Sequence, residues 1–137
     1  MRVLIADASV IWRHRLAHGL ATELPNVEVV GQAKDAPEGA RLIRQLKPDV
    51  IILDVLLPGG SGIDLLTDIR KTNPFALAIV LTNYLDGETR QRCMHQGADH
   101  FLAKSDGLEL LLAVLKRVRR SPPKRATAKE CSPNDPS

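Results

Sequence analysis

The chain has 137 residues, of which 44% are hydrophobic and only 3% aromatic. This is enough for one domain with an aliphatic core and too little for two. The net charge of +3 conceals two regions: residues 1–115 carry 12 Lys and Arg against 14 Asp and Glu, a net −2, whereas residues 116–137 carry 7 against 2, a net +5. No apolar run reaches membrane-spanning length and none resembles a secretory signal, so we expect a cytoplasmic protein without membrane contact.

Short apolar runs alternate with helical patterns along the chain. In chain order, the predicted strands cover residues 2–6, 27–31, 50–54, 78–82 and 99–103. The predicted helices cover about residues 9–24, 35–46, 61–72, 87–96 and 106–119. Ser9 and Asp35 are typical N-cap residues, and Gly97 is typical of the position after a helix end.

Alternation with such short connections predicts an α/β fold, a single doubly wound sheet of five parallel strands. The runs at 50–54 and 78–82 are apolar nearly throughout, as expected of central strands covered on both faces. Residues 121–137 lose this periodicity and contain Ser, Pro and Asn. We therefore expect one domain at residues 1–120, followed by a disordered basic, proline-containing tail.

Polar residues follow four of the predicted strands: Asp7, Asp54, Thr82 and Lys104. Each alone has an ordinary structural explanation, such as a turn, a strand end or a solvated lysine. Together they share the carboxyl edge of the sheet, where open α/β folds bind ligands. Two carboxylates, a hydroxyl and an ammonium suit phosphoryl transfer: Asp54 is the predicted nucleophile, Thr82 a hydrogen-bond donor, Lys104 a point charge, and Mg²⁺ a neutralising ion.

These motifs resemble the receiver domain of response regulators in bacterial two-component signalling, of the single-domain, CheY-like kind. The matching segments lie within about residues 1–120 and are Leu4-Ile5-Ala6-Asp7, Ile52-Leu53-Asp54-Val55-Leu56-Leu57-Pro58-Gly59, Ser61-Gly62-Ile63-Asp64-Leu65-Leu66, Leu81-Thr82-Asn83 and Gly97-Ala98-Asp99-His100-Phe101-Leu102-Ala103-Lys104. The resemblance implies a flavodoxin-like fold with strand order 2-1-3-4-5. It also implies that Asp54 receives its phosphoryl group from a sensor histidine kinase or a phosphotransfer protein.

The resemblance further implies a metal site and a switch. Mg²⁺ is expected at Asp7, Asp54 and the backbone carbonyl of Leu56. Thr82 is expected to move toward the phosphoryl group while the Phe101 ring turns inward. The surface that then changes its partner preference, for a downstream protein target or a dimer, is formed by residues 87–96, 99–103 and 106–119.

The chain departs from the family pattern after the first strand. The family usually has two adjacent acidic residues there, whereas Asp7 is followed by Ala8. The missing carboxylate is the one that normally touches the metal. Two interpretations stay open: weak Mg²⁺ binding that still supports phosphorylation, or a pseudo-receiver that signals by protein binding alone. Leu56 and Tyr84 stand at positions that flank the path of hydrolytic water in the family, which predicts slow loss of the phosphoryl group.

Other functions receive less support from the sequence. We expect a stand-alone signalling module rather than an enzyme, one that catalyses only its own phosphorylation and dephosphorylation. An aspartate-nucleophile phosphatase needs a second acid near Asp54, where Val55 and Leu56 follow instead. A flavin binder is disfavoured by the low aromatic content. The basic run from Lys116 to Arg125 is typical of a solvated helix end, and the tail is too short for a helix-turn-helix domain, so nucleic-acid binding is not expected.

Overall fold

The computed structural model describes residues 1–120, and the tail predicted at 121–137 lies outside this range. The strands are β1 (Arg2–Ala6), β2 (Glu28–Ala33), β3 (Val50–Leu53), β4 (Leu77–Thr82) and β5 (His100–Ala103). The helices are α1 (Val10–Glu23), α2 (Ala36–Leu46), α3 (Gly62–Thr72), α4 (Gly87–His95) and α5 (Gly107–Arg120), with a 3₁₀ turn η1 (Lys104–Asp106) before the last. No helix in the described part of the chain is long and apolar enough to cross a membrane.

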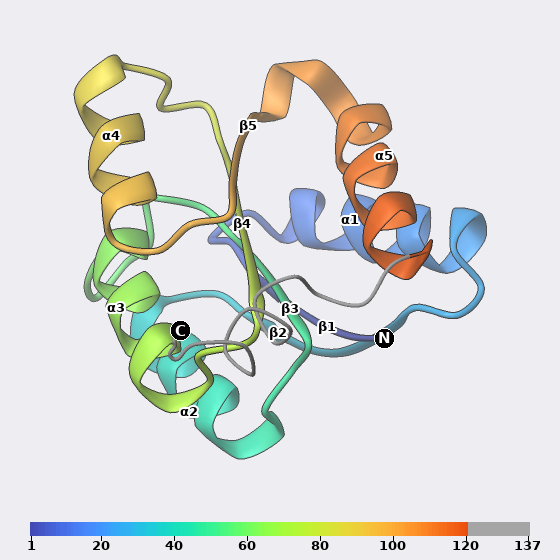
Figure 1. Cartoon of the computed structure of the whole chain (residues 1–137), viewed down its shortest axis with the longest axis horizontal. Coiled ribbons are helices and arrows are strands. Elements are labelled where there is room, and N and C mark those ends of the chain that lie inside the picture. The colour runs from blue at the N-terminus through green and yellow to red at the C-terminus, as the bar shows by residue number, and fades with distance from the viewer. Residues whose placement is uncertain (121–137) are drawn as a thin grey trace, which may run out of the picture.

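All strand pairs are parallel, and the sheet order is β2-β1-β3-β4-β5. This confirms the predicted doubly wound, flavodoxin-like architecture. Figure 1 shows the sheet between two layers of helices, with α2, α3 and α4 on one face and α1 and α5 on the other. Parallel strands joined by helical crossovers are covered on both faces in this way.

The core consists of two apolar clusters, one on each face of the sheet. Because successive side chains of a strand point to opposite faces, each strand contributes to both clusters. The cluster under α2, α3 and α4 contains Leu4, Ile51, Leu53, Ala78, Val80, Ile43, Leu66 and Ile69. The cluster under α1 and α5 contains Val3, Ile5, Ile52, Ile79, Leu81, Leu16, Leu20, Leu111 and Leu115. Burial of each large aliphatic side chain contributes about 1.5–3 kcal/mol.

Most boundaries differ from the predicted ones by one or two residues, and the predicted strand at 50–54 ends at Leu53, before Asp54. The strand predicted at 27–31 runs from Glu28 to Ala33, because a register shift between Val3 and Leu4 realigns β1 and lets Ala6 pair with Ala33. At the other end of the domain, the chain makes a 3₁₀ turn over Lys104–Asp106, and α5 begins at Gly107, whose φ is 71°. This positive φ favours glycine, and it separates the turn at Lys104 from the last helix.

Four helices begin at side-chain N-caps that also shape the loops at the carboxyl edge of the sheet. Each cap accepts a hydrogen bond from the backbone N–H three residues on, and the caps are Ser9, Asp35, Ser61 and Asp86. At the start of α3, the N–H of Gly62 donates to the Val55 carbonyl at 2.8 Å. A Cβ at Gly62 would lie 2.8 Å from the Val55 Cα. Glycine at position 62 therefore lets the first turn of α3 pack directly against the backbone that follows β3.

Candidate functional site

The four polar residues predicted at the carboxyl edge come together in the structure. Asp7 follows β1, Asp54 follows β3, Thr82 ends β4 and Lys104 follows β5. Their exposed fractions are 3%, 8%, 1% and 6%, and they are the buried polar residues of the part that the structure describes. Buried polar groups are costly without partners. Their clustering at one edge therefore marks this edge as the candidate site.

The sheet itself places the two carboxylates side by side. Beyond the paired strands, the N–H of Asp7 donates to the Ala33 carbonyl at 2.9 Å, and the N–H of Asp54 donates to the Ala6 carbonyl at 3.0 Å. These bonds extend the parallel ladder by one residue past β1 and β3. The backbone of each aspartate is thus hydrogen-bonded to the neighbouring strand, although neither residue belongs to a strand.

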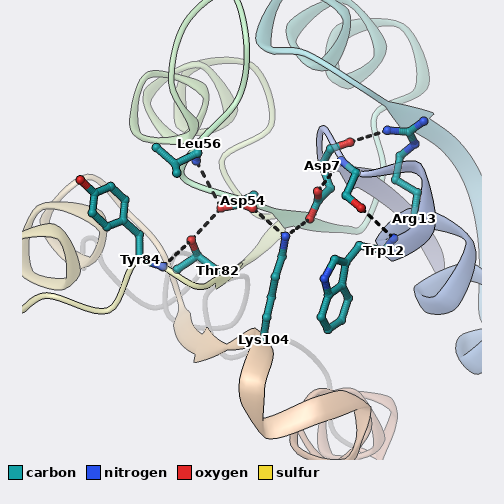
Figure 2. A network of polar contacts seen from close by, with 9 residues as sticks. Asp7, Trp12, Arg13, Asp54, Leu56, Thr82, Tyr84 and Lys104 are labelled. Atoms are coloured by element: carbon teal, nitrogen blue, oxygen red, sulfur yellow. Dashed lines mark hydrogen bonds and ion pairs between the residues drawn. The ribbon is translucent and has the colours of Figure 1, made fainter.

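Lys104 bridges the two carboxylates. Its Nζ lies 2.8 Å from Asp7 Oδ2 and 2.8 Å from Asp54 Oδ2, as Figure 2 shows. Burial by itself lowers the pKa of the Lys104 ammonium, but hydrogen bonds and charge from Asp54 and Asp7 outweigh it and raise this pKa above the ordinary value. The ammonium is therefore charged at neutral pH, and one positive charge faces two carboxylates.

The other oxygen of Asp54 is held by two donors. The Thr82 hydroxyl donates to Asp54 Oδ1 at 2.7 Å, and the backbone N–H of Leu56 donates to the same oxygen at 3.2 Å. The Thr82 hydroxyl in turn accepts a hydrogen bond from the N–H of Tyr84 at 3.1 Å. The Asp54 carboxylate is thereby contacted by the end of β4, the loop after β3 and the turn after β5, and Thr82 links it to the loop that leads into α4 (Figure 2).

Asp7 connects the site to the start of α1. Its Oδ1 accepts a hydrogen bond from the N–H of Ser9 at 2.8 Å, and its backbone carbonyl accepts one from the Arg13 guanidinium. Ser9 caps α1 by accepting from the N–H of Trp12 at 3.2 Å. The Trp12 ring reaches back toward the site, with the Lys104 Nζ 5.2 Å from its centroid.

An open depression of about 520 Å³ lies beside this cluster, between the loop after β3 and helix α4. Ala8, Leu56, Tyr84, Thr89 and Arg92 are among its lining residues. Leu56 and Tyr84 are 60% and 48% exposed, so apolar side chains stand at the rim. The small Ala8 side chain adds no charge there. The depression is lined by residues next to the cluster in sequence, Ala8 after Asp7 and Val55 and Leu56 after Asp54.

Phe101, the predicted switch residue, lies on β5 and is half-buried against the core cluster under α2, α3 and α4. The guanidinium carbon of Arg90, on α4, is 5.7 Å from the centre of its ring. Phe101 pairs with Val80 in the sheet, two residues before Thr82. The ring therefore lies on the α4 side of the sheet, and Phe101 belongs to the same strand pair as the hydroxyl that contacts Asp54.

The oxygen ligands of the site limit which metal ion it can bind. Within the described residues, no group of three or more His, Cys, Asp and Glu side chains is arranged to hold a metal ion. Two carboxylates, Asp7 and Asp54, are available, and Ala8 supplies none. Hard oxygen ligands of this number fit Mg²⁺, which usually keeps several waters and binds one or two carboxylates together with a phosphate.

Sequence reasoning did not find Trp12 and Arg90 as neighbours of the site. Trp12 packs against the cluster under α1 and α5. Its contact with Lys104 joins α1 to the end of β5, and Arg90 joins α4 to Phe101 in the same way. No local sequence pattern predicts either contact.

Comparison with known proteins agrees with this geometry. The response regulator receiver domain family matches residues 3–116. The transcriptional regulatory protein LiaR of Bacillus subtilis is 32% identical over 124 residues, which are 90% of this chain and 58% of LiaR. Response regulator GacA of Pseudomonas aeruginosa is 30% identical over 118 residues, which are 86% of this chain and 55% of GacA. The chain thus spans little more than half the length of these two curated relatives.

Solved structures give the same result. The response regulator domain of Thermotoga maritima CheB has a TM-score of 0.77 and 29% identity, over 88% of this chain and 94% of that domain. A CheY-like receiver domain protein from Methanospirillum hungatei JF-1 has a TM-score of 0.77 and 28% identity, over 85% of this chain and 90% of its own. The chain belongs to the response regulator receiver domain family. It is a signalling module of the two-component type, as the resemblance predicted.

Proposed function

We propose that Asp54 accepts a phosphoryl group from a phosphohistidine of a sensor histidine kinase or phosphotransfer protein in the cytoplasm. The surroundings of Asp54 support this role. Its carboxylate is buried and is contacted by Lys104 and Thr82, and the two residues that follow it, Val55 and Leu56, line an open depression. A nucleophile needs this combination of fixed position, neighbouring positive charge and access for the donor.

In the proposed reaction, a carboxylate oxygen of Asp54 forms a bond to phosphorus while the donor's P–N bond breaks. The electron pair of that bond stays on the imidazole nitrogen. Protonation of this nitrogen gives the neutral histidine of the donor. The product is an acyl phosphate on Asp54. Because the phosphoryl group is strongly negative, the ammonium of Lys104 and the hydroxyl of Thr82 are the groups of this chain that stabilise its oxygens.

Asp7, Asp54 and the backbone carbonyl of Leu56 are the proposed Mg²⁺ ligands, with water in the other positions. The ion, when bound, supplies positive charge to the phosphoryl oxygens. Lys104 provides one positive charge against the two carboxylates that it contacts. The carboxylates of the cluster therefore outnumber its cation before any phosphoryl group arrives. With Ala8 in place of a third carboxylate, we expect weak metal binding.

Phosphorylation is proposed to act through the contact between Thr82 and Asp54. In the unphosphorylated structure, the N–H of Tyr84 donates a hydrogen bond to the Thr82 hydroxyl. If this hydroxyl moves toward the phosphoryl group, the N–H of Tyr84 must move with it or find another acceptor. The ring of Phe101 then turns toward the space near Thr82. This rearranges α4, β5 and α5, the proposed surface for a downstream protein target and for a dimer.

The test is the intact mass of the protein after incubation with acetyl phosphate and Mg²⁺. We expect the wild type to gain one phosphoryl group and Asp54→Ala to gain none. Asp64→Ala is the matched control, since Asp64 is an exposed carboxylate on α3, and it should be modified as the wild type is. A wild type that gains no mass, or an Asp54→Ala variant that does, contradicts the proposed role.

Ala8 supports a second candidate function, a pseudo-receiver that binds partners without efficient phosphorylation. Titration of Mg²⁺ in the same mass assay separates the two, because a pseudo-receiver stays unmodified even at tens of millimolar metal. Ala8→Asp restores the acidic pair after β1. For a weak metal site, this variant should reach half-maximal modification at a lower Mg²⁺ concentration than the wild type.

A further inference from the structure

Lys104 has a third neighbour besides the two carboxylates. Its Nζ lies 5.2 Å from the centroid of the Trp12 ring, within the range of a cation–π contact. Figure 2 shows the indole alongside the lysine side chain, on the side of α1. Trp12 is the one tryptophan of the chain. Its ring also packs against the core cluster under α1 and α5, so the ring itself is anchored.

These contacts form a closed circuit around the site. Asp7 accepts from the N–H of Ser9, Ser9 caps the helix by accepting from the N–H of Trp12, and the Trp12 ring lies beside the ammonium of Lys104. Lys104 closes the circuit by returning to Asp7 at 2.8 Å. The place of the tryptophan is therefore set by the same carboxylate that pairs with the lysine.

We propose that Trp12 is a positioning residue for phosphoryl transfer, whose ring holds the Lys104 ammonium between Asp7 and Asp54. The inference rests on the proposed role of Asp54 as phospho-acceptor. A lysine ammonium is a point charge on a flexible stem of four carbons, and its position is not determined by its own geometry. The two hydrogen bonds hold the Nζ end, and the anchored aromatic ring beside the lysine limits how the stem can bend.

The ring acts on the rate through electrostatics as well as shape. The face of an indole attracts a cation, and the attraction is larger for a cation that is as buried as Lys104, at 6% exposed. Loss of the ring should slow phosphorylation of Asp54 roughly 5- to 30-fold. Arg15 also lies over Trp12, with its guanidinium carbon 4.9 Å from the ring centroid, but it is exposed and contacts neither carboxylate in the described structure.

The test compares Trp12→Leu, Trp12→Phe and the control Arg15→Ala with the wild type, using acetyl phosphate and Mg²⁺. We expect Trp12→Leu to lower the maximal rate constant without a matching change in the acetyl phosphate concentration at half-maximal rate. Trp12→Phe should recover most of the rate, because a benzene ring keeps the negative face. Arg15→Ala should behave as the wild type does. If Trp12→Leu does not fold, Trp12→Met takes its place.

A second measurement is independent of phosphorylation. In the wild type, the ring current of Trp12 should shift the ε-methylene protons of Lys104 upfield in the NMR spectrum, and this shift should vanish in Trp12→Leu. Unchanged Lys104 shifts, or a Trp12→Leu variant as fast as the wild type, overturn the proposal. If the wild type takes up no phosphoryl group, the role of Asp54 fails, and the NMR comparison alone decides whether Trp12 holds Lys104.

Discussion

Substitution of Lys104 by Met is the most direct test of the buried charge cluster. Met keeps most of the apolar stem and removes the ammonium, which lies 2.8 Å from a carboxylate oxygen of both Asp7 and Asp54. The two carboxylate side chains are only 5% and 11% exposed. The variant therefore leaves two nearly buried negative charges facing each other without a cation.

Removal of one partner from a buried ion pair costs about 3–5 kcal/mol. Asp54 is 8% exposed, and Val55 and Leu56 beside it line the open depression, so water relieves part of the cost. We therefore expect a loss of about 3 kcal/mol in the free energy of unfolding. Total stabilities of such domains are about 5–15 kcal/mol, so the loss is a large share. Because the folded state raises the pKa of Lys104 above 10.5, the contribution is complete below pH 10.5 and is lost as the pH rises through the raised value.

Urea unfolding followed by circular dichroism measures this loss, with and without Mg²⁺. The added cation should stabilise Lys104→Met more than the wild type, because it replaces the missing positive charge. Asp54→Asn in the Lys104→Met background should recover part of the stability, because one of the opposed charges is gone. A Lys104→Met variant within about 1 kcal/mol of the wild type, with no recovery in the double variant, would refute the account of the cluster.

Three further changes test other parts of the domain. Gly62→Ala should lower the free energy of unfolding by roughly 1–3 kcal/mol or more in urea, because the new Cβ meets the Val55 Cα, whereas Gly87→Ala, with open space around it, should not. Burial lowers the pKa of His100 below 6.5, so the free energy of unfolding should fall as the pH falls below 6.5. His100→Gln should make the free energy of unfolding depend less on pH in this range. An equal pH dependence in both proteins would contradict this account. Leu56→Asn should speed loss of the phosphoryl group, measured by mass over time, since it replaces an apolar side chain at the rim of the depression; an unchanged lifetime would count against this role.

The elements and their order could be predicted because their signals are local. N-cap residues such as Ser9 and Asp35, and apolar periodicity, depend on neighbours within a few positions along the chain. The boundaries of β2 were less accurate, since its register depends on the shift in β1 between Val3 and Leu4. A strand's pairing with its neighbour is a property of the sheet, and local pattern does not specify it.

The site divides in the same way. That Asp7, Asp54, Thr82 and Lys104 share one edge follows from the strand pattern alone, because the carboxyl ends of parallel strands meet at one side of a sheet. Which atoms pair there depends on packing between residues far apart in sequence: Lys104 and Asp54 are separated by 50 positions, and Thr82 and Asp54 by 28. The place of Trp12 beside the ammonium was decided by how α1 docks on the sheet. Such contacts form only when the whole core packs, so they cannot be predicted from local sequence.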